Sequence, residues 1–85
     1  MLAFVYKSLR KDDTYLYLRE RDGFALLPQP LLARLGALDF VMELDLAPPR
    51  RLARADAAAV REALDGEGYY LQLPPTEVER LHGRG

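Results

Sequence analysis

The sequence predicts a small α/β domain of the α+β type: an α/β/α sandwich around a mainly antiparallel sheet, with elements in the order β-β-α-β-α-β-α. Two observations carry this prediction. Apolar and polar residues alternate over several short segments, as they do in strands, and apolar stripes with helical spacing lie between these segments. The connection between the first two strand-like segments is also short, so these two should pair as an antiparallel hairpin.

The length of the chain sets the scale of the fold. Its 85 residues have room for one hydrophobic core, so we expect a single domain over residues 1–85. This core should run from about residue 2 to residue 81, and the tail 82–85 should fray. Hydrophobic residues make up 49% and charged residues 29% of the chain, a composition that argues against wholesale disorder.

Four segments have the pattern of strands. Residues 2–8 are rich in aromatic and branched side chains, and residues 14–19 alternate clearly, with tyrosines on one side and leucines on the other. Residues 69–73 form a further strand, which two prolines end. Residues 39–46 alternate as well, and their parity places four apolar side chains on one face, namely Phe40, Met42, Leu44 and Leu46.

Three segments have the signals of helices. Residues 28–36 begin with prolines and end at a glycine, which can end a helix in the left-handed conformation. Residues 57–64 follow an aspartate that suits the N-cap, and they present Val60 and Leu64 on one side. A capping box predicts a last helix over residues 77–81. Because both strand faces carry apolar side chains, we expect helices on both faces of the sheet.

The overall charge and composition exclude several classes of protein. Twelve basic and thirteen acidic residues give a net charge of −1, which argues against a general polyanion binder, so we expect no DNA partner. No segment approaches the length of a membrane span, so we expect no membrane partner. The absence of cysteine excludes disulfides and thiolate metal sites. The cysteine-free composition fits a bacterial cytoplasmic protein, and this is the location we expect.

The inventory of reactive side chains is small. The chain has no cysteine, and its one histidine, His82, lies in the tail that should fray, where a general base would not be held in position. Ser8 has no histidine nearby, so we expect it to close the hairpin and not to act as a nucleophile. The glycines form no phosphate-binding loop. The sequence therefore predicts no cofactor and no catalytic residue.

One group of carboxylates offers an enzymatic alternative. Asp39, Glu43 and Asp45 share one strand face by parity, and carboxylate oxygens are the ligands that Mg²⁺ and Mn²⁺ prefer. Alternate strand positions lie roughly 7 Å apart, so these side chains would have to lean together to share an ion. The sequence favours a solvated face that pairs with Lys7 or Arg19. We predict no metal site, and a small metal-dependent hydrolase remains the alternative function.

A basic and aromatic surface on the hairpin is the stronger candidate site. Basic side chains bind phosphates or acidic partners, and exposed tyrosines stack on unpaired bases or anchor a protein. Nearby aspartates and glutamates dilute this charge. The candidate binding residues are Lys7, Arg10, Lys11, Tyr15, Tyr17 and Arg19. A second basic cluster precedes the second long helix and consists of Arg50, Arg51 and Arg54.

Several motifs in this sequence resemble those of the YcgL domain family. They are Tyr6-Lys7-Ser8, the stretch from Arg10 to Tyr17, Leu35-Gly36, the lead from Leu52 to Asp56, and Gly68-Tyr69-Tyr70-Leu71-Gln72-Leu73-Pro74-Pro75. They follow one another in the family's order over nearly the whole chain. The sequence departs from the pattern at Leu9 and in its short tail. The resemblance implies an α/β/α sandwich and a bacterial cytoplasmic protein, and it implies no catalytic residue.

These observations support one main hypothesis on function. The chain is expected to be a non-enzymatic interaction module that binds protein or RNA through the basic and aromatic hairpin surface. The metal-dependent hydrolase that uses Asp39, Glu43 and Asp45 is the alternative. An interaction module requires accessible aromatic side chains, whereas an enzyme requires a concave site with converging polar groups.

Overall fold

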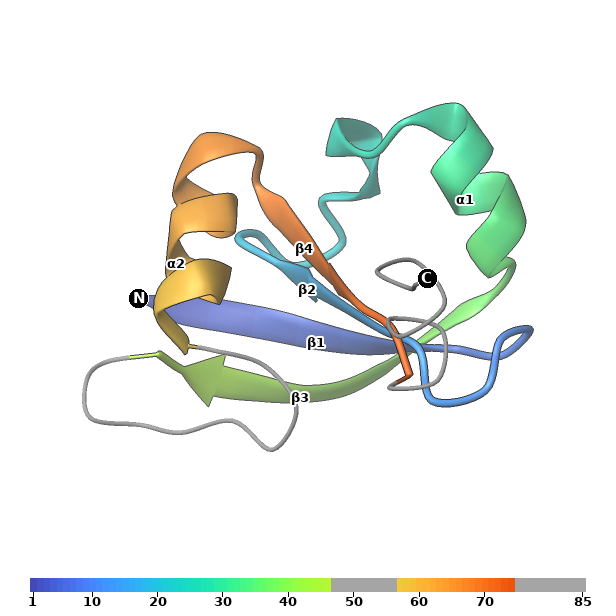
Figure 1. Ribbon diagram of the computed structural model, residues 1–85, viewed down its shortest axis with the longest axis horizontal. Coiled ribbons are helices and arrows are strands. Elements are labelled where there is room, and N and C mark those ends of the chain that lie inside the picture. Colours follow the sequence, from blue (N-terminus) through green and yellow to red (C-terminus); the bar gives the residue numbers. More distant parts are fainter. Residues whose placement is uncertain (47–56, 75–85) are drawn as a thin grey trace, which may run out of the picture.

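The computed structural model describes residues 1–46 and 57–74 (Figure 1). The elements of these residues are β1 (Leu2–Ser8), β2 (Tyr15–Leu18), the 3-10 helix η1 (Phe24–Leu26), α1 (Gln29–Leu35), β3 (Leu38–Asp45), α2 (Ala57–Gly66) and β4 (Tyr69–Gln72). The described residues thus form a mixed α/β fold with a four-stranded antiparallel sheet and two α-helices. The predicted helix over residues 77–81 lies outside the described residues.

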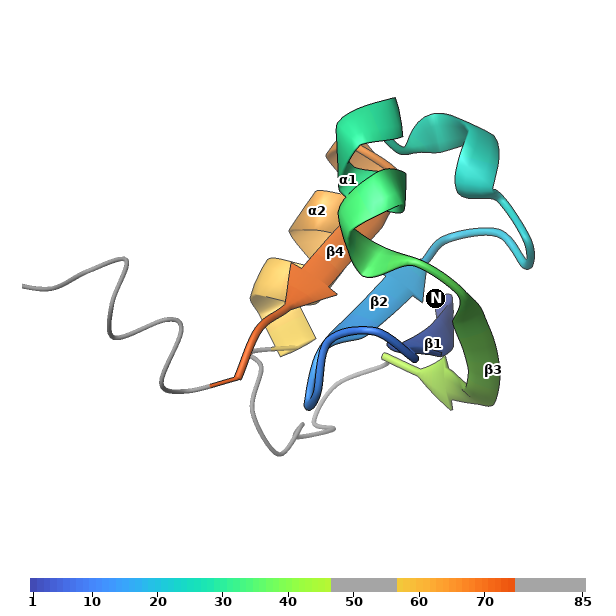
Figure 2. The same cartoon turned by 90° about the vertical axis from the view of Figure 1, so that its right-hand side faces the viewer.

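The sheet has the strand order β3-β1-β2-β4. β1 pairs with β2 through the predicted hairpin and with β3 on its other side, and β2 pairs with β4, all antiparallel. β1 and β2 are therefore the central strands, and β3 and β4 form the two edges (Figures 1 and 2). The central position of β1 follows from its composition, because nearly every side chain of this strand is apolar or small.

Side chains along the central strands alternate between two hydrophobic clusters. Val5 belongs to a cluster that includes Val60 and Leu64 of α2. Its neighbour Tyr6 belongs to a second cluster, which includes Leu35 of α1. Because successive strand residues point to opposite sides of a sheet, the two clusters lie on different sides of β1. We call these sides the Val5 face and the Tyr6 face.

β3 contains one residue more than its partner strand. Val5 lies opposite Met42, whereas the next residue, Tyr6, lies opposite Phe40, so Val41 is the additional residue of a β-bulge. A bulge of one residue reverses the parity of a strand. Phe40 therefore lies on the Tyr6 face, whereas Met42 lies on the Val5 face.

The bulge overturns one prediction from the sequence. The expected common face of Phe40, Met42, Leu44 and Leu46 is wrong for Phe40. The rings of Tyr6 and Phe40 contact edge to face with their centroids 5.5 Å apart, and Leu38 also packs on the Tyr6 cluster. Leu44 and Leu46 belong to the Val5 cluster. One strand thus supplies apolar side chains to both clusters. In a strand without the bulge, these side chains would all lie on one face and could reach only one cluster.

The two helices begin and end close to their predicted bounds. α1 ends at Leu35, and the next residue, Gly36, has a positive φ of 68°, which glycine adopts most readily. The Gly36 N–H donates to the Leu32 carbonyl at 3.0 Å. In α2 the buried residues are Val60 and Leu64, as predicted. The 3-10 turn η1 has no counterpart among the predicted elements. No helix in the described parts of the chain is long and apolar enough to cross a membrane.

The difference in burial along β3 leads to a prediction on stability. Leu44 is 7% exposed in the Val5 cluster, whereas Met42, on the same strand and face, is 45% exposed. We expect Leu44→Asp to lower the free energy of unfolding by about 3 kcal/mol or more, because it buries a carboxylate without a partner. Met42→Asp should cost about 1 kcal/mol or less. Urea unfolding of both variants measures the difference, and equal losses would contradict the deeper burial of Leu44.

Candidate functional site

Ser8 holds the turn between β1 and β2, where the sequence predicts the binding surface. Its buried hydroxyl donates to the Leu35 carbonyl at 2.7 Å and accepts from the backbone N–H groups of Arg10 and Lys11 at 3.2 and 3.0 Å. These bonds tie the turn to the last residue of α1. Because its proton and its acceptor positions are all in use, the Ser8 hydroxyl has the structural role that the sequence predicts.

A row of polar side chains crosses the sheet next to this turn. Lys7 lies opposite Tyr15 of β2 on one side and opposite Asp39 of β3 on the other, and Tyr15 in turn lies opposite Gln72 of β4. Lys7 and Asp39 are exposed, and Tyr15 is half-buried against the Val5 cluster. The row lies on the Val5 face. It is the polar end of a face that is otherwise apolar.

A shallow pocket of about 270 Å³ opens between this row and the turn. It is lined by Lys7, Ser8, Asp12, Asp13 and Tyr15. Asp13 adopts a left-handed backbone conformation, with φ of 55°, which aspartate tolerates better than most residues. The lining carries one lysine and two aspartates, so its balance is acidic. The pocket presents charges of both signs, which suit hydrogen bonds and ion pairs with protein side chains better than they suit a phosphate.

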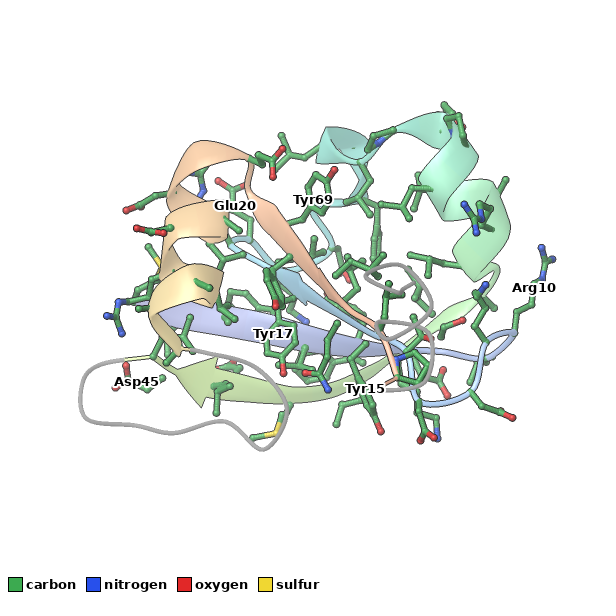
Figure 3. All side chains as sticks on the ribbon, in the orientation of Figure 1. Arg10, Tyr15, Tyr17, Glu20, Asp45 and Tyr69 are labelled. Carbon is green, nitrogen blue, oxygen red and sulfur yellow. The ribbon has the colours of Figure 1, made fainter. Side chains whose placement is uncertain are left out.

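Arg10, a predicted binding residue, is engaged with α1. Its guanidinium donates from Nη1 to the carbonyl of Ala33 at 2.7 Å, in the last turn of the helix. The side chain extends from the β1–β2 turn (Figure 3) and packs so closely on Gly36 that an added Cβ there would lie 3.0 Å from the Arg10 Nε atom. The last carbonyls of a helix lack intrahelical partners and attract cations. Arg10 therefore caps α1.

Arg19 has the corresponding position at the end of α2. Its Nη1 atom lies 3.5 Å from the carbonyl oxygen of Asp65, in the last turn of that helix. The whole of β2 separates Arg19 from the pocket at the turn. The predicted surface is thus divided: Lys7, Lys11 and Tyr15 lie near the pocket, whereas Arg10 and Arg19 contact the ends of two different helices.

Tyr17 is buried, which corrects its prediction as part of an exposed surface. Its side chain is 7% exposed in the Val5 cluster, and its hydroxyl donates to Gln72 Oε1 at 2.7 Å. The Tyr17 and Tyr70 rings meet edge to face with centroids 5.8 Å apart. Burial raises the pKa of the Tyr17 phenol, and the nearby Tyr70 and Tyr15 hydroxyls raise it further. Tyr17 lies opposite Val5, on the same face as Lys7, but it is inside the cluster, whereas Lys7 lies at the exposed end of that face.

The carboxylate trio does not share a face, so that prediction is wrong. Asp39 lies opposite Lys7 on the Val5 face, whereas Glu43 lies opposite Phe4 on the Tyr6 face. Asp45, two residues after Glu43, also lies on the Tyr6 face. The bulge at Val41 lies between them and reverses the parity. In residues 1–46 and 57–74 no group of three potential metal-binding side chains comes together.

One predicted cluster lies outside the described residues, and two residues that line the pocket were not among the predicted binding residues. Arg50, Arg51 and Arg54 lie outside the described residues. Asp12 and Asp13, which the sequence suggested only as residues that dilute a basic patch, line the pocket. The one sequence signal for them is their place in the short charged connection between the first two predicted strands, beside the predicted binding residues Arg10 and Lys11.

Comparison with known proteins identifies relatives over nearly the whole chain. The family model described as the YcgL domain matches residues 3–75. A YcgL domain-containing protein of Xanthomonas euvesicatoria is 58% identical over 78 residues, which cover 92% of this chain and 91% of the relative. A relative from Stenotrophomonas maltophilia is 53% identical over 76 residues, which cover 89% and 88%. Each relative is named for its domain alone.

The division of the carboxylates generates a prediction on metal binding. Because Asp39 lies on the face opposite to Glu43 and Asp45, these three side chains cannot converge on one ion. Millimolar Mg²⁺ or EDTA should therefore leave the melting temperature unchanged, since only a ligand that binds the folded state raises stability. A magnesium-dependent rise that Glu43→Gln abolishes would contradict the separation of these carboxylates.

The buried tyrosine generates a prediction on alkaline stability. The folded state raises the Tyr17 pKa above its ordinary value, so the stability linked to this phenol is complete below about pH 10 and is lost as the pH rises through the folded pKa. Tyr17→Phe should lower stability at pH 7 by about 1 kcal/mol, because it leaves Gln72 Oε1 without its donor.

The same variant should lose less stability than the wild type at alkaline pH. Some alkaline loss should remain, because burial also raises the pKa of Tyr6. Urea unfolding at neutral and alkaline pH measures both effects. Parallel stability curves for the wild type and Tyr17→Phe would show that the Tyr17 phenol does not contribute.

Proposed function

The chain belongs to the YcgL domain family, and we propose that it is a non-enzymatic interaction module that binds a protein through the turn between β1 and β2. We further propose a cytoplasmic location, a single domain over residues 1–85 and the α/β/α layering that the sequence predicts. The layering is supported by the alternation of β1 residues between a cluster that includes α1 and a cluster that includes α2.

The pocket at the turn is the observation that carries the proposal. Its lining combines the basic residue Lys7, the acidic residues Asp12 and Asp13, and the half-buried Tyr15. Charged groups of both signs around an aromatic side chain are suited to hydrogen bonds and ion pairs with protein side chains. The bonds of Ser8 hold the backbone of the turn in place, so little ordering would accompany binding.

The charges at this site favour protein over RNA. Binding of single strands requires a groove with a net positive charge and exposed aromatic rings on which bases stack. Here Arg10 and Arg19 contact helix carbonyls, Tyr17 is buried, and two aspartates line the pocket. The hydrolase alternative has less support, because its three carboxylates lie on two faces of the sheet.

A charge reversal at Lys7 tests the proposal. Lys7 is exposed in the pocket, and Arg34 is an exposed residue of α1, so Lys7→Glu and Arg34→Glu change the net charge equally at two different places. Arg34→Glu should stay within about 0.5 kcal/mol of wild-type stability, and Lys7→Glu within about 1 kcal/mol, because its new carboxylate lies directly opposite Asp39. The immobilised chain should retain proteins from a bacterial lysate after nuclease treatment. Lys7→Glu should lose them, and Arg34→Glu should keep them.

Two results would contradict this proposal. Release of the retained material by nuclease, together with saturable anisotropy changes for a labelled single-stranded RNA, would identify RNA as the partner. Equal retention by the wild type and Lys7→Glu would show that the pocket at the turn is not the binding site.

A further inference from the structure

β3 forms an edge of the sheet and exposes apolar side chains there. Among residues 1–46 and 57–74, the strand pairs with β1 on one side and has no neighbouring strand on the other (Figure 1). Its three consecutive apolar residues Phe40, Val41 and Met42 are 38%, 46% and 45% exposed. Natural proteins usually protect edge strands with charges and keep exposed apolar patches for binding. The edge at β3 has both charged residues and an exposed apolar patch.

The bulge distributes these apolar side chains over both faces of the edge. Phe40 lies on the Tyr6 face, where the guanidinium of Arg21 stacks over its ring at 4.2 Å from the centroid, and Met42 lies on the Val5 face. A strand added beside β3 would therefore meet an apolar side chain on either face. Its backbone would bond the N–H and C=O groups of β3 that point away from β1.

We propose that β3 docks an extended segment of a partner protein, which adds to the sheet as a further strand and carries apolar residues together with a basic residue on each of its two faces. This surface is separate from the pocket at the turn, and the inference does not rest on the proposed function. The acidic character of β3 is what selects the basic residues. Its eight residues include three carboxylates and no lysine or arginine.

The positions of the carboxylates define what the segment must carry. Asp39 and Glu43 flank the apolar residues on different faces of the strand, and Asp45, near the N-terminal amino group at 3.8 Å, ends it. Opposite charges directly across two strands stabilise their pairing. A lysine or arginine opposite Glu43 and another opposite Asp39 would match both faces, with an apolar residue between them beside Val41.

A second copy of this chain is the less favoured occupant. Its β3 carries three carboxylates and no lysine or arginine, so it cannot supply the cations that Asp39 and Glu43 attract. Charges on an edge strand are a common protection against self-association. The carboxylates therefore favour a basic strand over a second copy of β3.

Selection from a random nonapeptide library displayed on phage tests the proposal. The immobilised wild-type chain should enrich peptides that combine branched or aromatic residues with two lysines or arginines an odd number of positions apart, a spacing that places them on opposite faces of a strand. The enriched sequence, as a synthetic peptide, should shift the backbone amide resonances of residues 38–45 and slow their hydrogen exchange. Glu43→Lys should weaken its binding by about tenfold, because an attraction becomes a repulsion.

Glu62→Lys is the matched control, because it makes the same charge change at an exposed position of α2 and should leave the peptide affinity unchanged. The proposal is overturned if no peptides are enriched over those from the Glu43→Lys chain, or if acidic peptides are selected. It is also overturned if the resonance shifts map to the turn at Ser8. Dimerisation through β3 in sedimentation equilibrium would likewise overturn it and identify a second copy as the occupant.

Discussion

The rest of the structure depends on the register shift between β1 and β3. Val5 lies opposite Met42 while its neighbour Tyr6 lies opposite Phe40, so one additional residue, Val41, reverses the parity of β3. This single change lets one edge strand supply side chains to both hydrophobic clusters. It also places Asp39 on one face and Glu43 and Asp45 on the other, and it divides the exposed residues Phe40 and Met42 between the two faces of the edge. A regular strand would have produced a different surface.

Much of the fold can be predicted from the sequence, because alternation and helix-ending residues are local signals. The hairpin follows from two short apolar segments with a charged connection, and the end of α1 follows from Gly36. The bulge could not be predicted, since no glycine or proline marks it and Phe40 has the same parity as Leu44. The one clue in the sequence was Val41, an apolar residue on a strand face that was otherwise acidic. Alternation by itself gives no reason to place a bulge at this residue.

The candidate site is harder to predict than the fold, because a charged residue can bind a partner or complete a helix. Arg10 and Arg19 have the spacing of a basic patch, yet their guanidinium groups contact the last-turn carbonyls of α1 and α2. Unsatisfied carbonyls at a helix end attract any cation within reach, and which cations are within reach depends on tertiary structure. Lys7 and Tyr15 remain near the pocket, and the aspartates beside them change its charge balance.

The register of β3, measured by cross-strand nuclear Overhauser effects in the wild-type chain, tests the central role of the bulge most directly. We predict contacts between the backbones of Tyr6 and Phe40 and between those of Val5 and Met42, with Val41 opposite neither as a regular partner. A contact between Tyr6 and Val41 in place of that between Tyr6 and Phe40 would show a regular strand. All three carboxylates would then share one face, which would contradict the division of β3 between the two faces of the sheet.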